Sequence, residues 1–150
     1  MTPTDLTPEL AAKYDHLKST LRELGSERAW VVHADDGLDE ISTLGPTRIS
    51  ELNAGQVRTW KFDPTEVGIE RVHLADLQVQ NVDEAAALLQ DVLAGNKGPA
   101  RDIAALNAAA AIVVAGQSPS LPEALIQAYH ALDSGAARAT LQSLVEYSHA

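Results

Sequence analysis

The sequence contains no cysteine, which excludes disulfide bonds, zinc–thiolate centres and a cysteine nucleophile. Basic residues are also scarce: there are 11 Lys and Arg against 21 Asp and Glu, and the formal net charge is −10. Binding to nucleic acid or to an anionic membrane surface needs a face rich in Lys and Arg, so we expect neither kind of partner. Any bound metal would be held by oxygen or imidazole ligands, and a phosphorylated ligand would need a cation beside it.

Long apolar runs are absent as well. No window approaches the roughly 18 consecutive apolar residues of a membrane-spanning helix, and the opening residues, MTPTDLTPEL, do not combine a basic region with an apolar core. These features favour a cytoplasmic protein. What the sequence does contain is 150 residues of which 45% are hydrophobic, enough to form one domain with its own core.

The first half of the chain predicts a helix, a strand and a hairpin. Residues 8–24 carry a helical stripe of leucines that ends at Gly25. Residues 28–33, RAWVVH, form a short apolar run without alternation, which is typical of a strand covered on both faces in a parallel sheet. Segments 47–53 and 56–62 alternate between apolar and polar residues, and the Ala-Gly break between them predicts a β-hairpin.

The second half predicts four helices. They are expected at 82–94, at 100–115, from residue 121 to about 132, and after Gly135. The alanine-rich second helix predicts close packing against a neighbour. Together these elements indicate the α/β class: a partial mixed sheet flanked by helices, in a single domain that spans residues 1–150.

One stretch, HADDGLDEIS at 33–42, crowds four carboxylates into six residues: Asp35, Asp36, Asp39 and Glu40. Like charges repel, so this crowding needs either a cation or a solvated surface turn. The stretch follows the predicted strand, and ligands collect at the carboxyl ends of parallel strands. Adjacent Asp39 and Glu40 can both supply oxygen ligands to Mg²⁺ after a tight turn at Gly37. From the spacing alone, a magnesium site and an ordinary acidic turn at Asp36-Gly37 both remain open.

Three blocks of the sequence share an order with a known family: VVHADDGLDEIS, LGPTRISELNAGQV and VLAGNKGPARDIAALNAAAAI. From about Thr7 onwards the chain resembles the C-terminal half of the anthranilate phosphoribosyltransferases, a branch of the glycosyltransferase family that also contains the pyrimidine nucleoside phosphorylases. The resemblance implies the C-terminal α/β domain of that fold. It also implies transfer of a phosphoribosyl group from 5-phosphoribosyl 1-diphosphate to the amino group of anthranilate, with release of pyrophosphate, in tryptophan biosynthesis. Asp39 and Glu40 fall on the acidic pair that binds magnesium in that family.

Several features of the family are missing from this sequence. Ala34 replaces a glycine, and the chain has no Gly-Thr-Gly-Gly-Asp loop, no Lys-His-Gly-Asn-Arg segment and no N-terminal helical domain. Because those parts position the substrates, we expect a truncated domain with little or no activity alone. Two hypotheses follow: a phosphoribosyltransferase completed by an N-terminal fragment or second chain, or a non-catalytic remnant or interaction module that keeps the fold.

Other polar residues have structural interpretations. No residue is assigned as catalytic. The resemblance implies a transfer without a covalent enzyme intermediate, so the absence of an obvious nucleophile does not contradict it. His33 is predicted to be packed or hydrogen-bonded. Arg101 and Asp102 lie at the start of a helix, where capping and an intrahelical pair are favoured over phosphate binding by Lys97 and Arg101. Asn107 is predicted to bridge a neighbouring helix or loop as a satisfied buried amide. The aromatic residues are too dispersed for a stacking platform and are expected to pack in the core: Trp30, Trp60, Phe62 and Tyr129.

Overall fold

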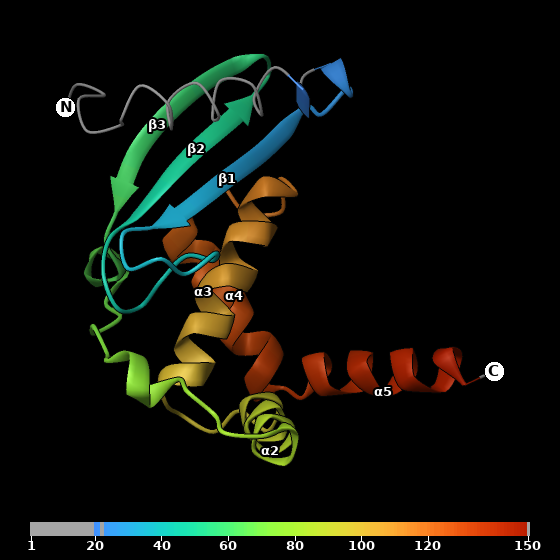
Figure 1. Cartoon of the computed structure of the whole chain (residues 1–150). Coiled ribbons are helices and arrows are strands. Elements are labelled where there is room, and N and C mark those ends of the chain that lie inside the picture. The colour runs from blue at the N-terminus through green and yellow to red at the C-terminus, as the bar shows by residue number, and fades with distance from the viewer. Residues whose placement is uncertain (1–19, 22, 150) are drawn as a thin grey trace.

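The computed structural model describes residues 20–21 and 23–149 of the chain. In these residues a three-stranded sheet comes from the first half of the sequence, and helices α2 to α5 come from the second half (Figure 1). The sheet packs over α3 and α4, which confirms the predicted α/β class with helices against a sheet. Most of the predicted helix at 8–24 lies outside the described residues.

The three strands are β1 (Arg28–Ala34), β2 (Thr47–Asn53) and β3 (Gln56–Phe62), in the order β1-β2-β3. Both pairs are antiparallel, with Val32 opposite Ile49 and Ile49 opposite Trp60. The predicted hairpin is confirmed, and its two-residue loop has positive φ angles at Ala54 (47°) and Gly55 (77°), as a type I′ turn requires.

The prediction that residues 28–33 form a strand covered on both faces in a parallel sheet is wrong for the described part of the chain. β1 pairs antiparallel with β2, and its residues up to Val32 are only half-buried. An unbroken apolar run indicates that a segment contacts the core, but it carries no information about the direction of the neighbouring strand. The sheet is therefore antiparallel throughout its described strands rather than mixed.

The core lies between the inner face of the sheet and the helices α3 (Pro99–Val114) and α4 (Leu121–Asp133). Ile41, Ile49 and Leu106 are completely buried there. Alanines such as Ala105 and Ala109 line α3 where it packs closely with α4, as the composition of this segment predicts.

The helix ends follow local signals. Asn81 caps α2 (Val82–Leu93) by accepting a hydrogen bond from the Glu84 N–H, and Gly95 follows the helix with a φ of 79°. Ser120 caps α4, and α5 (Ala136–Ser148) then extends away from the body of the domain without a buried residue (Figure 1). All four predicted helices are thus confirmed: the first three agree to within one residue at either end, and the fourth begins directly after Gly135 as predicted.

The segment between the sheet and α2 contains two 3₁₀ turns, η1 (Pro64–Val67) and η2 (Leu74–Asp76). Asp63 caps η1 through a hydrogen bond from the Thr65 N–H and also pairs with Arg71. None of the helices in the described range is both long enough and apolar enough to cross a membrane.

Candidate functional site

The acidic loop, residues 35–46, leaves the end of β1 and returns to the start of β2. The Asp35 N–H donates to the Pro46 carbonyl at 2.9 Å, which closes the base of the loop. Asp36 braces its interior: Oδ1 accepts from the Leu38 N–H at 3.0 Å and Oδ2 accepts from the Ser42 hydroxyl at 2.6 Å. Gly37 occupies the turn with a φ of 93°, where a side chain would be strained.

The four carboxylates of the loop therefore have different surroundings. Asp36 is engaged inside the loop, and Asp35 forms an ion pair of 3.0 Å with Lys61 on β3. Asp39 and Glu40 are exposed, and their side chains form no hydrogen bond or ion pair with any described residue. His33 is exposed too, so the prediction that it is packed or hydrogen-bonded is wrong.

The residues that follow Asp39 and Glu40 are buried and hydrogen-bonded to the rest of the domain. Ile41, Ser42 and Thr43 are completely buried. The side chain of Asn107 on α3 accepts from the Ile41 N–H and donates to the Ile41 carbonyl, both at 2.9 Å. The Ser42 N–H donates to Thr47 Oγ1, also at 2.9 Å. The prediction that Asn107 bridges to a neighbouring loop is confirmed.

The carboxylates of Asp39 and Glu40 can be compared with the ligands that different metals require. Within the described part of the chain, no group of three or more His, Asp or Glu side chains converges on one point. A metal held by protein ligands alone, such as structural zinc or calcium, therefore does not fit. Mg²⁺ does fit, because it commonly takes one or two protein carboxylates and completes its shell with waters and phosphate oxygens.

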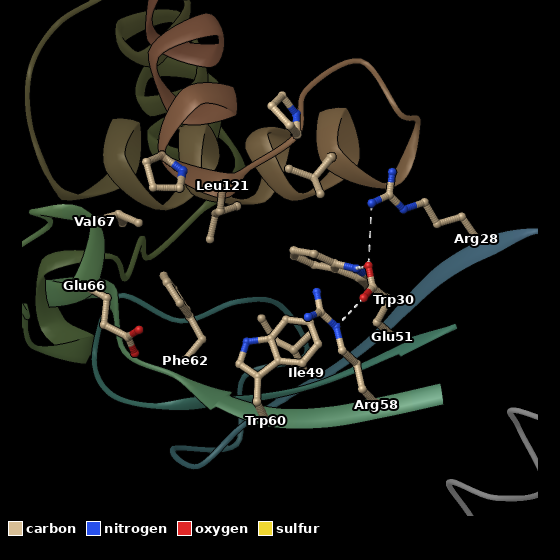
Figure 2. A pocket seen from close by; sticks show the side chains of 13 residues that line it. Arg28, Trp30, Ile49, Glu51, Arg58, Trp60, Phe62, Glu66, Val67 and Leu121 are labelled. Atoms are coloured by element: carbon tan, nitrogen blue, oxygen red, sulfur yellow. Dashed lines mark hydrogen bonds and ion pairs between the residues drawn. The ribbon is translucent and has the colours of Figure 1, made fainter. Parts of the chain in front are cut away.

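A second feature is a cavity of about 350 Å³ between the sheet and the helices (Figure 2). None of the described acidic-loop residues lines it. At one end Glu51, whose side chain is 2% exposed, accepts hydrogen bonds from Trp30 Nε1 at 3.0 Å and from Arg58 Nε at 2.5 Å. The Arg28 guanidinium lies 3.8 Å from the same carboxylate. We call Arg28, Glu51 and Arg58 the charged cluster.

The electrostatics of the charged cluster favour an ionised Glu51. Burial opposes ionisation, but the hydrogen bonds from Trp30 and Arg58 and the charges of the two arginines outweigh it, so the pKa of Glu51 lies below its usual value. Trp30 and Trp60 meet edge to face at 5.6 Å, and Arg58 stacks over Trp60 at 4.7 Å. Sequence reasoning missed this cluster, although a glutamate on the inward-facing register of a strand was a signal for it.

Arg101 and Asp102, at the start of α3, have other partners than the sequence predicted. Arg101 donates to Asp133 at 2.6 Å and stacks over the ring of Tyr129 at 4.5 Å, while Asp102 accepts from the Tyr129 hydroxyl at 2.7 Å. Both residues thus bind α4, and the predicted intrahelical pair is wrong. Burial, together with the hydrogen bond to Asp102, raises the pKa of Tyr129. This group joins α3 to α4.

The fold and the loop together define an α/β domain whose loop between β1 and β2 presents two adjacent carboxylates that have no partner in the described part of the chain. Comparison with known proteins places this class of domain more narrowly. The family described as "Glycosyl transferase family, a/b domain" matches residues 6–138, and the chain belongs to this family.

Relatives in sequence and structure have one name in common. The chain is 49% identical over 133 residues to the anthranilate phosphoribosyltransferase of Nitrosomonas europaea, a match that covers 89% of this chain and 39% of the relative. The crystal structure of the enzyme of that name from Thermus thermophilus has a TM-score of 0.80 and 36% identity, and the match covers 96% of this chain and 41% of the other.

A third match carries information about ligands. Anthranilate phosphoribosyltransferase from Saccharomyces cerevisiae in complex with PRPP and Mg has a TM-score of 0.77 and 27% identity, over 91% of this chain and 39% of the other. The chain therefore spans about two fifths of the length of the relatives that it matches.

Proposed function

We propose that this chain is the metal-binding C-terminal part of an anthranilate phosphoribosyltransferase. The reaction transfers the phosphoribosyl group of 5-phosphoribosyl 1-diphosphate to the amino group of anthranilate and releases pyrophosphate. The observation that carries the proposal is the pair Asp39 and Glu40 on an otherwise braced loop. Both carboxylates are exposed and have no partner among the described residues, in a chain similar to an enzyme solved with PRPP and Mg. Residues 1–150 would form one truncated α/β domain of that enzyme.

The assigned role of the pair is to hold Mg²⁺ beside the diphosphate. When bound, the ion would neutralise negative charge on the leaving group as the bond between C1 and oxygen breaks. The contribution of the chain itself is to present two carboxylate groups for which the described residues supply no competing partner. Lys61 and Ser42 leave the pair free because they engage Asp35 and Asp36 instead.

The remaining substrate contacts are assigned to an N-terminal fragment or second chain. This assignment is supported by the length of the match, about two fifths of each relative, and by the edge position of β1. Among the described strands β1 pairs only with β2, so its other edge presents backbone groups to which a further strand can bond. Phosphoribosyl transfer depends on precise positioning of both substrates, so we expect the chain alone to show little or no activity.

A complementation assay tests this function. Loss of anthranilate fluorescence would be followed with Mg²⁺ and 5-phosphoribosyl 1-diphosphate, using the chain alone and the chain mixed with the N-terminal part of a full-length relative. Activity only in the mixture would support the proposal. Inactivity in both samples, with a folded chain, would instead favour the alternative of a non-catalytic remnant or interaction module.

A matched pair of variants isolates the metal role within that assay. Replacing both Asp39 and Glu40 by alanine should abolish magnesium-dependent turnover and leave the fold intact, because both side chains are exposed. The control is Asp35→Ala, which removes a carboxylate from the same loop but only its exposed ion pair to Lys61. Equal activity in the double variant and the control would remove the metal assignment.

A further inference from the structure

We infer that Asn107 is a positioning residue for the metal-binding pair: it holds the backbone next to Glu40 so that the two carboxylates are presented in one arrangement. The inference rests on the proposed function and extends it to a residue on a different element, 66 positions further along the chain than Ile41. Asn107 does not touch the metal in this proposal. It acts through the peptide group that joins residues 40 and 41.

The geometry of this contact is specific. Asn107 Oδ1 accepts from the Ile41 N–H at 2.9 Å, and Nδ2 donates to the Ile41 carbonyl at 2.9 Å, so one amide side chain satisfies both backbone groups of one residue. Ile41 is completely buried, and its backbone groups would otherwise lack a partner away from water. The contact is thus strongly favoured over an open loop.

The orientation of the Ile41 N–H has a direct consequence for Glu40. A peptide group is planar, so the direction of the Ile41 N–H fixes the direction of the Glu40 carbonyl. Only the rotation about the Cα–C bond of Glu40 then relates that plane to the Cα–Cβ bond of Glu40. A fixed plane therefore restricts the origin from which the Glu40 side chain reaches its carboxylate position. Asp39 precedes it directly, so the restriction reaches the whole pair.

The base of this contact is rigid. Asn107 Nδ2 also donates to the Ile103 carbonyl one turn earlier in α3, at 3.0 Å, which limits rotation of the amide. The neighbouring residues Leu106 and Ala105 are buried in the core at 0% and 1% exposure. The side chain that holds the loop thus projects from α3, which buries more residues than the other α-helices in the described range.

A second brace acts from the other side of the pair. Asp36 accepts from the Leu38 N–H and from the Ser42 hydroxyl, so it ties the residue before Asp39 to the second residue after Glu40. Asp36 and Asn107 therefore enclose the pair between two fixed points. The four crowded carboxylates do not form one ligand cluster, because one of them stabilises the loop that presents two others.

The test measures metal binding directly, without activity. Mn²⁺ would serve as the probe for the full chain in the presence of inorganic pyrophosphate, with free Mn²⁺ counted by electron paramagnetic resonance. Removing a group that orients a metal ligand typically weakens metal affinity by about 10- to 100-fold. We expect at least a roughly ten-fold loss in Asn107→Ala, because both hydrogen bonds to Ile41 disappear.

Two further variants and a control keep the result interpretable. Asn107→Asp preserves the shape and one acceptor but removes the donor to the Ile41 carbonyl, so it should also weaken binding, and it serves as the test if Asn107→Ala does not fold. The control is Asn96→Ala, an exposed asparagine whose side chain only bonds Asp91 and which should bind Mn²⁺ like the unaltered chain. Amide hydrogen exchange should show faster exchange of the Ile41 N–H in Asn107→Ala without metal.

The outcomes separate this inference from the proposed function. If the double variant at Asp39 and Glu40 loses Mn²⁺ while both Asn107 variants bind it like the unaltered chain, the positioning role is overturned and the metal pair stands. If the unaltered chain and the double variant bind Mn²⁺ equally, or neither binds it, the metal pair fails and the positioning role fails with it. Weakened binding that recovers at higher Mn²⁺ concentration, in folded Asn107 variants only, supports the inference.

Discussion

Removal of the buried carboxylate at the centre of the charged cluster should measurably destabilise the domain. Glu51→Ala leaves the indole N–H of Trp30 without its acceptor and separates two guanidinium groups from their shared anion. Glu51→Gln keeps one acceptor oxygen, which can still serve Trp30, but it removes the charge and replaces the oxygen that accepts from Arg58 by an NH2 group. Comparison of the two variants therefore separates the hydrogen bond from Trp30 from the contacts with the two arginines.

The size of the effect follows from the exposure of each partner. Breaking a fully buried ion pair costs about 3–5 kcal/mol, because the remaining charge stays out of water. Here the Arg58 and Arg28 side chains are 71% and 28% exposed, so both can regain hydration, and we expect about 2 kcal/mol for Glu51→Ala. For a domain of this length that corresponds to a fall in Tm of about 4–8 °C. Glu51→Gln should lose roughly half as much, since it keeps an acceptor for Trp30.

Thermal melts followed by circular dichroism would measure the fall in Tm of the two Glu51 variants. Glu70→Ala is the control, because Glu70 is exposed. The pKa of Glu51 is lowered in the folded chain, so its ionic contribution is complete above the usual glutamate pKa and is lost as the pH falls through the folded pKa. The difference between the unaltered chain and Glu51→Gln should therefore shrink below about pH 4. A Glu51→Ala melt equal to that of the control, or a difference that widens in acid, would refute the reasoning.

Three other perturbations have defined outcomes. Ala54→Asn should raise Tm by about 2 °C, because alanine is strained at positive φ and Asn-Gly is the preferred type I′ pair; an unchanged melt would contradict the strain. Gly95→Ala should cost about 1–2 kcal/mol in urea unfolding, since φ is 79° and a Cβ would lie 3.2 Å from Asp133 Oδ1. The hydrogen bond from Arg71 holds the pKa of Asp63 at about 2. The contribution of the Asp63–Arg71 pair to the stability of the fold should therefore be complete above about pH 4 and lost as the pH falls through 2. Carbon NMR titration of Asp63 would show this, and an ordinary pKa near 4 would exclude it.

The sequence predicted those parts of the fold that local chemistry determines. Asn81 and Gly95 mark the ends of α2 because a cap and a left-handed residue act within one turn, and the break at Ala54-Gly55 marks the hairpin for the same reason. The direction of β1 relative to its neighbour could not be read this way, because strand pairing depends on residues far along the chain. Arg101 shows the same limit, since its partner Asp133 is 32 residues away.

Position alone could not assign roles to the four carboxylates of the acidic loop. Their spacing left a magnesium site and a solvated turn as competing interpretations, and the four side chains differ in their surroundings. Asp36 does what an ordinary turn residue does, by accepting a backbone N–H two positions later. A loop that is only a solvated turn does not need completely buried residues directly after Glu40. It also does not need the two hydrogen bonds between Asn107 and Ile41. Hydrogen bonds to Asp36 and Asn107 hold this loop, so two adjacent carboxylates that lack a partner among the described residues stay close to each other. A divalent cation between them would relieve their repulsion most directly.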